Sequence, residues 1–158
     1  MRSIGSFVIL AALLCRCHAA AAAALPENLP AAREPVVLWP ADKQHVGTPD
    51  DPLCERDQAC SRIRAEGRVP ANTTPFFAVE PVAVSPRMWI QPRIHRVKRD
   101  GSFSGLVNLG EAHKGAKQWF KIYVFACANP NRFREGDEIV KLPDDCAVSD
   151  PVEVYRER

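Results

Sequence analysis

The stretch MWIQPRIHRVKRDGSFSGLVNLG, residues 88 to 110, carries the clearest structural signal in this chain of 158 residues. Its central Asp100-Gly101 pair predicts a tight turn, because glycine readily adopts the positive φ that such turns require. Apolar and polar residues alternate before the turn, from 88 to 97, and a run of β-forming residues follows it, from 102 to 110. The stretch therefore predicts a β-hairpin with one face in the core. The core-facing residues would include Ile90, Ile94 and Val107.

Outside the hairpin, further segments rich in β-branched and aromatic residues are separated by clusters of turn-forming residues. These segments are 35–39, 76–84, 118–127, 137–142 and 151–156. Together with the hairpin they predict a mainly β fold, an antiparallel sandwich of two sheets, for which immunoglobulin-like packing is the form we expect. That expectation rests on the strand pattern, because the cysteine and tryptophan spacing of antibody domains is absent.

Four cysteines lie beyond residue 24, and an even number in an exported chain predicts disulfide bonds. We expect the local pairs Cys54–Cys60 and Cys127–Cys146, and no metal site, because no pair has the short spacing that zinc ligands favour. The Asp-Pro pair at 51 and 52 also resembles a helix start, which predicts a short helix or an irregular insert near 51–65. A regular helix would point Cys54 and Cys60 about 240° apart. The helix and the first disulfide are therefore incompatible predictions.

The first 24 residues have the composition of a secretory signal peptide, with an apolar run from Ile4 to Leu14 and a small-residue tract from Ala19 to Ala24. The apolar run is too short to cross a bilayer, which takes about 20 residues. Neither cysteine in this region follows the small residues of a lipoprotein signal. We therefore predict a secreted or periplasmic protein with no transmembrane segment in the mature chain. Residues 25–34 would form a flexible leader, and residues 35–158 a single disulfide-bonded β-sandwich domain.

Removal of the signal peptide changes the charge balance. Arg2 and Arg16 leave with it, so 19 of the 21 basic residues remain, against 19 acidic residues. A neutral mature chain argues against a nucleic-acid partner, which would call for a strongly basic domain. The charge is uneven, however, because five bases and no acid lie between Glu80 and Asp100, whereas the segment 135–153 is predominantly acidic.

The hairpin supplies the first group of candidate binding residues. Its predicted solvent-facing side carries Trp89, Arg93 and His95, and the end near the turn carries a basic cluster. A basic hairpin end commonly serves to discourage edge pairing between sheets. The alternative is a surface for an acidic polysaccharide, an anionic lipid or an acidic protein. The residues of the basic cluster are Arg96, Lys98 and Arg99.

The segment 118–127 supplies the second group, because it is apolar on both faces and therefore predicts a central strand. One face is an aromatic row that contains Trp119, Tyr123 and Phe125. This row would either pack beneath the segment 40–74 or form an exposed aromatic platform, shared with Trp89, on which a sugar ring or a proline-rich partner would stack.

Motifs for catalysis are weak in this sequence. The segment GSFSG, residues 101–105, lacks the central serine of a nucleophile elbow, and His45, His95 and His113 lie far apart. We therefore predict no catalytic residues, no metal and no cofactor. The resulting hypothesis is an exported, non-enzymatic binding domain. Its partner would be a protein or a polysaccharide, and acidic partners are included in this hypothesis. Three alternatives stay open: a carbohydrate-binding module, a small secreted hydrolase or protease inhibitor, and a structural envelope-associated domain.

Overall fold

The computed structural model describes residues 34–47, 54, 60–94, 96–111 and 114–158. Strands dominate this part of the chain, and its two helical elements are single 3-10 turns. In chain order the elements are β1 (Val36–Trp39), β2 (Gln44–Val46), β3 (Arg62–Arg68), β4 (Thr74–Pro81), η1 (Val82–Val84), β5 (Met88–Ile90), β6 (Ser102–Asn108), β7 (Gln118–Cys127), η2 (Pro130–Arg132), β8 (Glu138–Ile139), β9 (Ala147–Val148) and β10 (Val152–Arg156).

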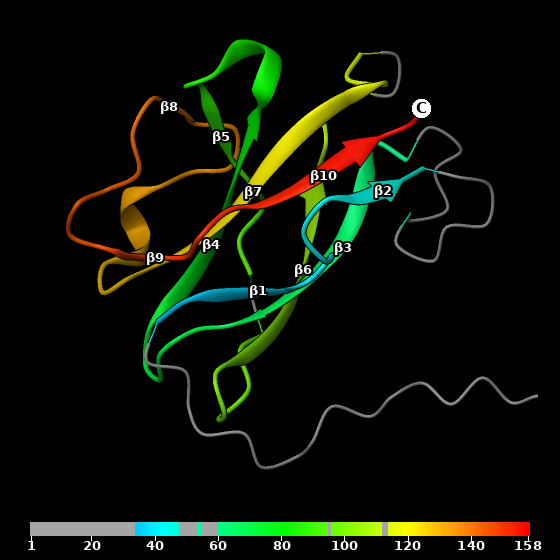
Figure 1. The fold of residues 1–158 in the computed structure, drawn as a ribbon. Helices are drawn as coiled ribbons and strands as arrows, with labels where there is room; N and C mark the ends of the chain where they lie inside the picture. The colour runs from blue at the N-terminus through cyan, green and yellow to red at the C-terminus, as the bar shows by residue number, and fades with distance from the viewer. Residues whose placement is uncertain (1–33, 48–53, 55–59, 95, 112–113) are drawn as a thin grey trace, which may run out of the picture.

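The strands form a small sheet and a large sheet (Figure 1). The small sheet has the order β1-β3-β6, and the large sheet has the order β2-β10-β7-β4-β5-β8, with β9 also paired to β7. Paired strands are antiparallel, apart from β2, which runs parallel to β10. This order matches the A-B-E and G-F-C-C′ strands of immunoglobulin-like sandwiches, with β2 beside the last strand. The predicted mainly β, two-sheet sandwich is therefore confirmed.

The main core lies between the two sheets and is built from alternating residues of facing strands. In β3, Ile63 and Ala65 are buried whereas Arg62 and Arg64 are exposed, which is the pattern of a strand with one face toward solvent. The facing strands β4 and β7 contribute an apolar row each. The central members of this core are Val37, Ile63, Phe77, Val79, Phe103, Val107, Phe120, Ile122, Val124 and Val154.

The outer face of the large sheet is covered as well, by the chain between β7 and β10. We call residues 128–148 the covering segment; it is coloured gold to orange in Figure 1. Beneath it, Phe125 stacks on Phe76 with the ring centroids 5.3 Å apart and meets Phe133 edge-on at 5.3 Å. Because β4 is enclosed between two cores, its residues from Pro75 to Glu80 are all buried.

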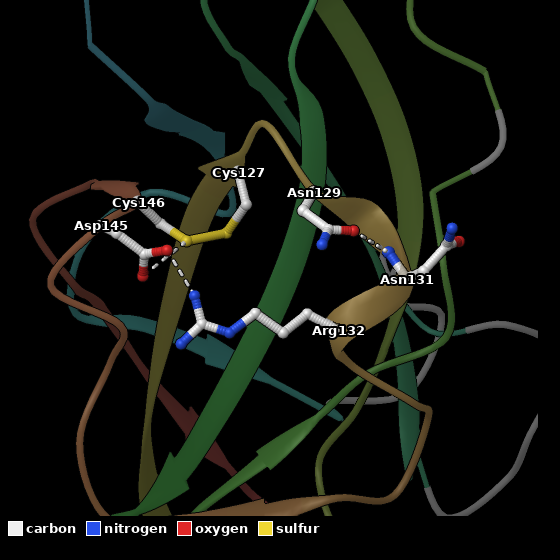
Figure 2. Close-up of a disulfide and its surroundings, with 6 residues drawn as sticks. All are labelled: Cys127, Asn129, Asn131, Arg132, Asp145 and Cys146. Atoms are coloured by element: carbon white, nitrogen blue, oxygen red, sulfur yellow. Dashed lines mark hydrogen bonds and ion pairs between the residues drawn. A yellow bond between two sulfur atoms is a disulfide. The ribbon is translucent and has the colours of Figure 1, made fainter.

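A disulfide between Cys127 and Cys146 fastens the covering segment to the end of β7 (Figure 2). Beside it, the side chain of Arg132 forms an ion pair with Asp145, the neighbour of Cys146. The Arg132 guanidinium lowers the pKa of the Asp145 carboxyl below its ordinary value. At the other end of the view, the Asn129 side chain accepts a hydrogen bond from the backbone N–H of residue 131 at 3.2 Å, which caps η2.

The other disulfide joins Cys54 to Cys60, so both predicted pairs are confirmed. Cys60 is buried, and Cys54 forms an isolated bridge with Ile63 of β3. The predicted helix near 51–65 is wrong at its C-terminal end, because β3 begins at Arg62. Residues 48–53 and 55–59 lie outside the described residues. The strand prevails because charged and apolar side chains alternate along it, which gives the sandwich a continuous buried face.

The predicted hairpin over 88–110 is formed only near its turn. There the N–H of Gly101, at φ +81°, donates to the carbonyl of Lys98 at 2.9 Å, and Val97 pairs with Phe103. The first predicted strand is wrong beyond Ile90, because β5 ends there and pairs with β4 and β8 in the large sheet. Proline has no N–H to donate, so Pro92 interrupts the ladder, and the chain then crosses to the small sheet.

This crossing divides the residues that the hairpin was expected to bury together. Ile90 packs beneath the covering segment, in the same cluster as Phe76 and Phe125. Ile94 and Val107 pack in the main core between the sheets. A single strand-turn-strand unit in the sequence thus contributes to both sheets of the sandwich.

The predicted signal peptide, 1–24, and all of the predicted leader except Glu34 lie outside the described residues. The first strand among the described residues is β1, which begins at Val36. Among the described residues, no helix has the length and apolar character needed to cross a membrane.

Candidate functional site

A basic surface covers the outer side of the small sheet. The side chains of Arg62 and Arg64 alternate with the core residues of β3 and therefore point away from the main core. The register with β6 places Arg64 opposite Leu106 and Arg68 opposite Ser102. We call this surface, together with the cations of the adjoining turn, the basic face. Its members are Arg62, Arg64, Arg68, Arg96, Lys98 and Arg99.

The turn continues the small sheet beyond β6. Val97 pairs with Phe103, whose ring points into the core, so the neighbours of Val97 on either side emerge on the outer side. These neighbours are Arg96 and Lys98, and both are exposed. The N–H of Lys98 also donates to the carbonyl of Ser102 at 2.8 Å, which fixes the two strands of the turn against each other. The predicted basic cluster therefore lies on the same surface as the cations of β3. These cations of β3 were not among the binding residues predicted from the sequence.

Most of these cations have no acidic partner. Among the residues that the structure describes, Arg64, Arg96, Lys98 and Arg99 form no ion pair. Arg68 differs, because it is buried beside the turn, with its Nη2 at 3.8 Å from Asp100. Glu66 of β3 lies on the same outer side, between Arg64 and Arg68, so the basic face also carries an acid, but its cations outnumber its acids.

The side chain of Asp100 stabilises the turn through hydrogen bonds. Its carboxylate accepts hydrogen bonds from the hydroxyl of Ser102 at 2.7 Å and from the backbone N–H of Ser102 at 3.0 Å. These two bonds, followed by the nearby charges of Arg68 and Lys98, lower the pKa of Asp100 below its ordinary value. The acid therefore stays ionised and organises the turn that carries the cations.

The other hairpin candidates lie elsewhere. Arg93 is exposed on the crossing between the sheets, and His95 lies outside the described residues. Trp89 of β5 pairs with Val79, which in turn pairs with Ile122. Because Val79 and Ile122 belong to the main core, Trp89 points to the same inner side of the large sheet.

Trp119 and Tyr123 point to the opposite, outer side of the large sheet, since they alternate with the core residues of β7. Trp119 packs against His45 and Tyr155 with ring centroids 5.7 and 5.2 Å away, and Lys43 Nζ lies 5.4 Å from its ring centroid. Trp89 is therefore on the other face from these aromatic side chains. The single platform predicted from the sequence is not formed.

Tyr123 is half-buried and its hydroxyl donates a hydrogen bond to Glu80 at 2.7 Å. Burial first, and then the hydrogen bond to this carboxylate, raise the pKa of Tyr123 above its ordinary value. Phe125 is fully buried, but the cover is Phe133 of the covering segment. The predicted cover by residues 40–74 is thus wrong for Phe125, whereas His45, within that range, does contact Trp119.

Two signals in the sequence could have located the missed residues. The strict alternation of charged and apolar residues from Arg62 to Arg68 indicates a strand with a charged outer side. In β10, Arg156 lies two residues after the core residue Val154 and therefore shares its side of the strand, which indicates a buried structural role. Among the described residues, no group of three or more His, Cys, Asp or Glu side chains could hold a metal ion.

Comparison with known proteins does not assign a family or a function to this chain. No family model, curated protein or solved structure matches the chain.

Proposed function

We propose that this protein is an exported, non-enzymatic binding domain that holds an acidic partner on the basic face. The observation that carries the proposal is that Arg64, Arg96, Lys98 and Arg99 are exposed and form no ion pair among the described residues. Like charges gathered on one surface repel one another, so the domain gains free energy when a partner brings opposite charges to them.

The shape of the basic face suits an extended partner. β3 and β6 are paired over seven residues each, from Arg62 with Asn108 to Arg68 with Ser102. At about 3.3 Å per residue, such a pair presents a surface roughly 20 Å long. A polymer with regularly spaced anionic groups can contact several cations along this length, and the contribution of each contact adds to the next.

Two disulfides support the proposed export. They persist mainly in oxidising compartments, such as the periplasm and the extracellular space. Cys54–Cys60 and Cys127–Cys146 each close a local loop, with sequence separations of 6 and 19. Mass mapping of the unreduced chain from its native source tests this point, because a free thiol at any of the four positions contradicts it.

Retention on an immobilised sulfated polysaccharide, with neutral dextran as the reference matrix, tests the binding function. We expect the mature chain to bind the sulfated matrix and to elute as salt increases, because exposed charges are screened within about 10 Å at 0.1 M salt. The variant R96E/R99E should bind at least about tenfold more weakly, a loss of about 1.4 kcal/mol.

A matched control separates a defined site from net charge. The variant R134E/K141E makes the same change in charge at two exposed cations of the covering segment, which are distant in sequence from the basic face. It should retain affinity within about twofold, or roughly 0.4 kcal/mol. Equal losses in both variants would show that net charge alone governs retention, and would overturn the proposal.

A further inference from the structure

A groove of about 670 Å³ opens beside Trp89, at the end of β6 that is remote from the basic turn. This volume lies in the range of roughly 300 to 1,000 Å³ that small-molecule sites occupy. One wall is formed by β5 and η1, and the opposite wall by the described residues, 109–111 and 114–117, of the 109–117 loop between β6 and β7. Glu135 and Gly136 of the covering segment complete the rim.

The groove exists because the small sheet does not extend over β5. Trp89 points to the inner side of the large sheet, but β6 is the last named strand of the small sheet on this side. The Trp89 side chain is therefore left half-buried, whereas Val79 and Phe120 behind it are covered. Gln91 closes the back of the groove, because its Oε1 accepts a hydrogen bond from the N–H of Asn108 at 2.8 Å.

A buried arginine fixes the opposite wall. Arg156 Nη1 donates to the carbonyl oxygens of Leu109, Glu111 and Lys114 at 2.7, 2.9 and 3.2 Å. The loop also turns at Gly115, which has φ +103° and where a Cβ would lie 3.0 Å from Arg156 Nη1. These contacts hold Leu109, Glu111 and Lys114 in place before any ligand arrives, which reduces the entropy that binding would cost.

The lining combines one aromatic face with a polar rim. Trp89 offers an indole beside aliphatic carbon, while hydrogen-bonding groups lie around the opening at Glu111, Lys114, Gln118 and Glu135. An indole packs against the C–H side of a sugar ring, and carboxylates, amides and amines match its hydroxyl groups. Lys114 is 3.3 Å from Glu111, and the charge of the exposed Glu135 is opposed by the Arg156 guanidinium behind the wall, so the groove has no excess of positive charge.

From this chemistry we propose that the groove binds a neutral saccharide, with one sugar ring against Trp89 and its hydroxyl groups on the rim. Without an excess of positive charge, the groove offers no counter-charge to uronic or sulfated sugars. The groove is therefore a second site, independent of the basic face in position and in the charge of its ligand. Arg156 acts in it as a positioning residue through the 109–117 loop.

Titration of the mature chain with cellohexaose, maltohexaose and hexa-N-acetylchitohexaose tests the site, with hexagalacturonate as the acidic probe. The chain has three tryptophans, so W39F/W119F leaves Trp89 as the one tryptophan reporter. At least one neutral hexasaccharide should change its emission saturably, with Kd at or below about 1 mM, or −4.1 kcal/mol. Hexagalacturonate should bind at least about tenfold more weakly than that hexasaccharide.

Calorimetric titration of variants with that hexasaccharide locates the contact. W89A should weaken binding at least about tenfold. E135A, at an exposed rim position, should weaken it about threefold or more without affecting the fold. The matched aromatic control is W119A, on the other face of the large sheet, and it should keep affinity within about twofold, as should R96E/R99E.

Three results would overturn the inference. The first is that none of the neutral hexasaccharides binds at concentrations up to about 10 mM, which corresponds to less than 3 kcal/mol. The second is that E135A and a folded W89A both bind like the original chain. The third is that R96E/R99E abolishes saccharide binding, because the groove and the basic face would then be one site. This last result leaves the proposed acidic-partner function standing, so failures of the two proposals are distinguishable.

Discussion

Arg156 Nη1 lies 2.7 Å from the carbonyl oxygen of Leu109, and both residues are fully buried. The arginine belongs to β10, near the C-terminal end of the chain, while Leu109 follows β6, 47 residues earlier. The contact therefore joins the large sheet to the loop that leaves the small sheet. Further bonds from the same guanidinium to Glu111 and Lys114 make this arginine a support for the described residues of the loop.

Replacement of Arg156 by methionine should strongly destabilise the protein. Methionine fills much of the same space but leaves buried carbonyl oxygens without their donor, and each such group costs about 1 to 3 kcal/mol. We expect a loss of about 3 kcal/mol or more in the free energy of unfolding, measured by urea denaturation. Replacement of the exposed Arg134 by methionine is the control and should change stability by less than about 0.5 kcal/mol. Equal effects of the two changes would contradict the supporting role of Arg156.

Loss of the Cys127–Cys146 disulfide should cost more stability than loss of the Cys54–Cys60 disulfide. The loop-entropy argument gives about 3 kcal/mol for the longer loop and about 2 kcal/mol for the shorter one. The double variants C127A/C146A and C54A/C60A can be compared by denaturation under non-reducing conditions. In C127A/C146A, amide hydrogen exchange should also rise in the covering segment. Unchanged exchange there would show that the second core holds this segment without the disulfide.

Substitution of Gly67 by alanine should destabilise the packing of neighbouring strands within the small sheet. A Cβ at this position would lie 2.5 Å from the carbonyl oxygen of Val36 and 2.6 Å from the ring of Phe103. Such overpacking typically costs about 1 to 3 kcal/mol, and thermal unfolding would report it. S104A, on the exposed side of the same sheet, is the control and should unfold at nearly the same temperature. A G67A protein as stable as the original would show that β1 can move away freely.

The stability of the protein at acidic pH should depend on Asp100. Its pKa is lowered in the folded state, so its contribution is complete above the ordinary value of 3.8 and is lost as pH falls through the lower folded value. The stability difference between the original chain and D100N should therefore shrink as the pH is lowered from 5 to 2. A carbon-13 titration of the Asp100 carboxyl should give a pKa below 3.8, rising toward it in S102A. A pKa unchanged by S102A would contradict the hydroxyl as the main cause.

Local patterns were sufficient to predict the larger part of the fold. β7, from Gln118 to Cys127, coincides with its predicted segment, and the Asp100-Gly101 turn and both disulfides are also confirmed. Each of these features depends on residues close together in the chain, so the sequence pattern contains the information that determines them.

The errors occur where the partner of a strand decides its structure. The alternation from Met88 to Val97 predicted one continuous strand, but the strand ends at Ile90, because a pattern does not state which sheet each half joins. Ile90 packs beneath the covering segment, and Ile94 packs between the sheets. The helix near 51–65 was predicted from its start signal alone. The end of that range belongs instead to β3, whose partners β1 and β6 are distant in sequence.

The candidate site could be predicted only in part, because strand pairing brings some of its residues together. The cations Arg96, Lys98 and Arg99 are adjacent in sequence and were visible there, but their union with Arg64 depends on the strand pairing. The groove beside Trp89 could not be predicted, because its wall is set by the long-range contact of Arg156 with the 109–117 loop.

The shortness of the outer strands has a consequence for copies of the protein at high concentration. In the described part of the large sheet, the edge strands are β2, with three residues, and β8, with two. In the small sheet, β1 has four residues and its register shifts between Val37 and Trp39. A neighbouring chain thus finds few consecutive unpaired N–H and C=O groups at these three edges. The fourth edge is β6, which has seven residues and is bridged on its free side at Phe103, to Val97. Edge-to-edge association of two copies through the described strands would therefore take place at β6.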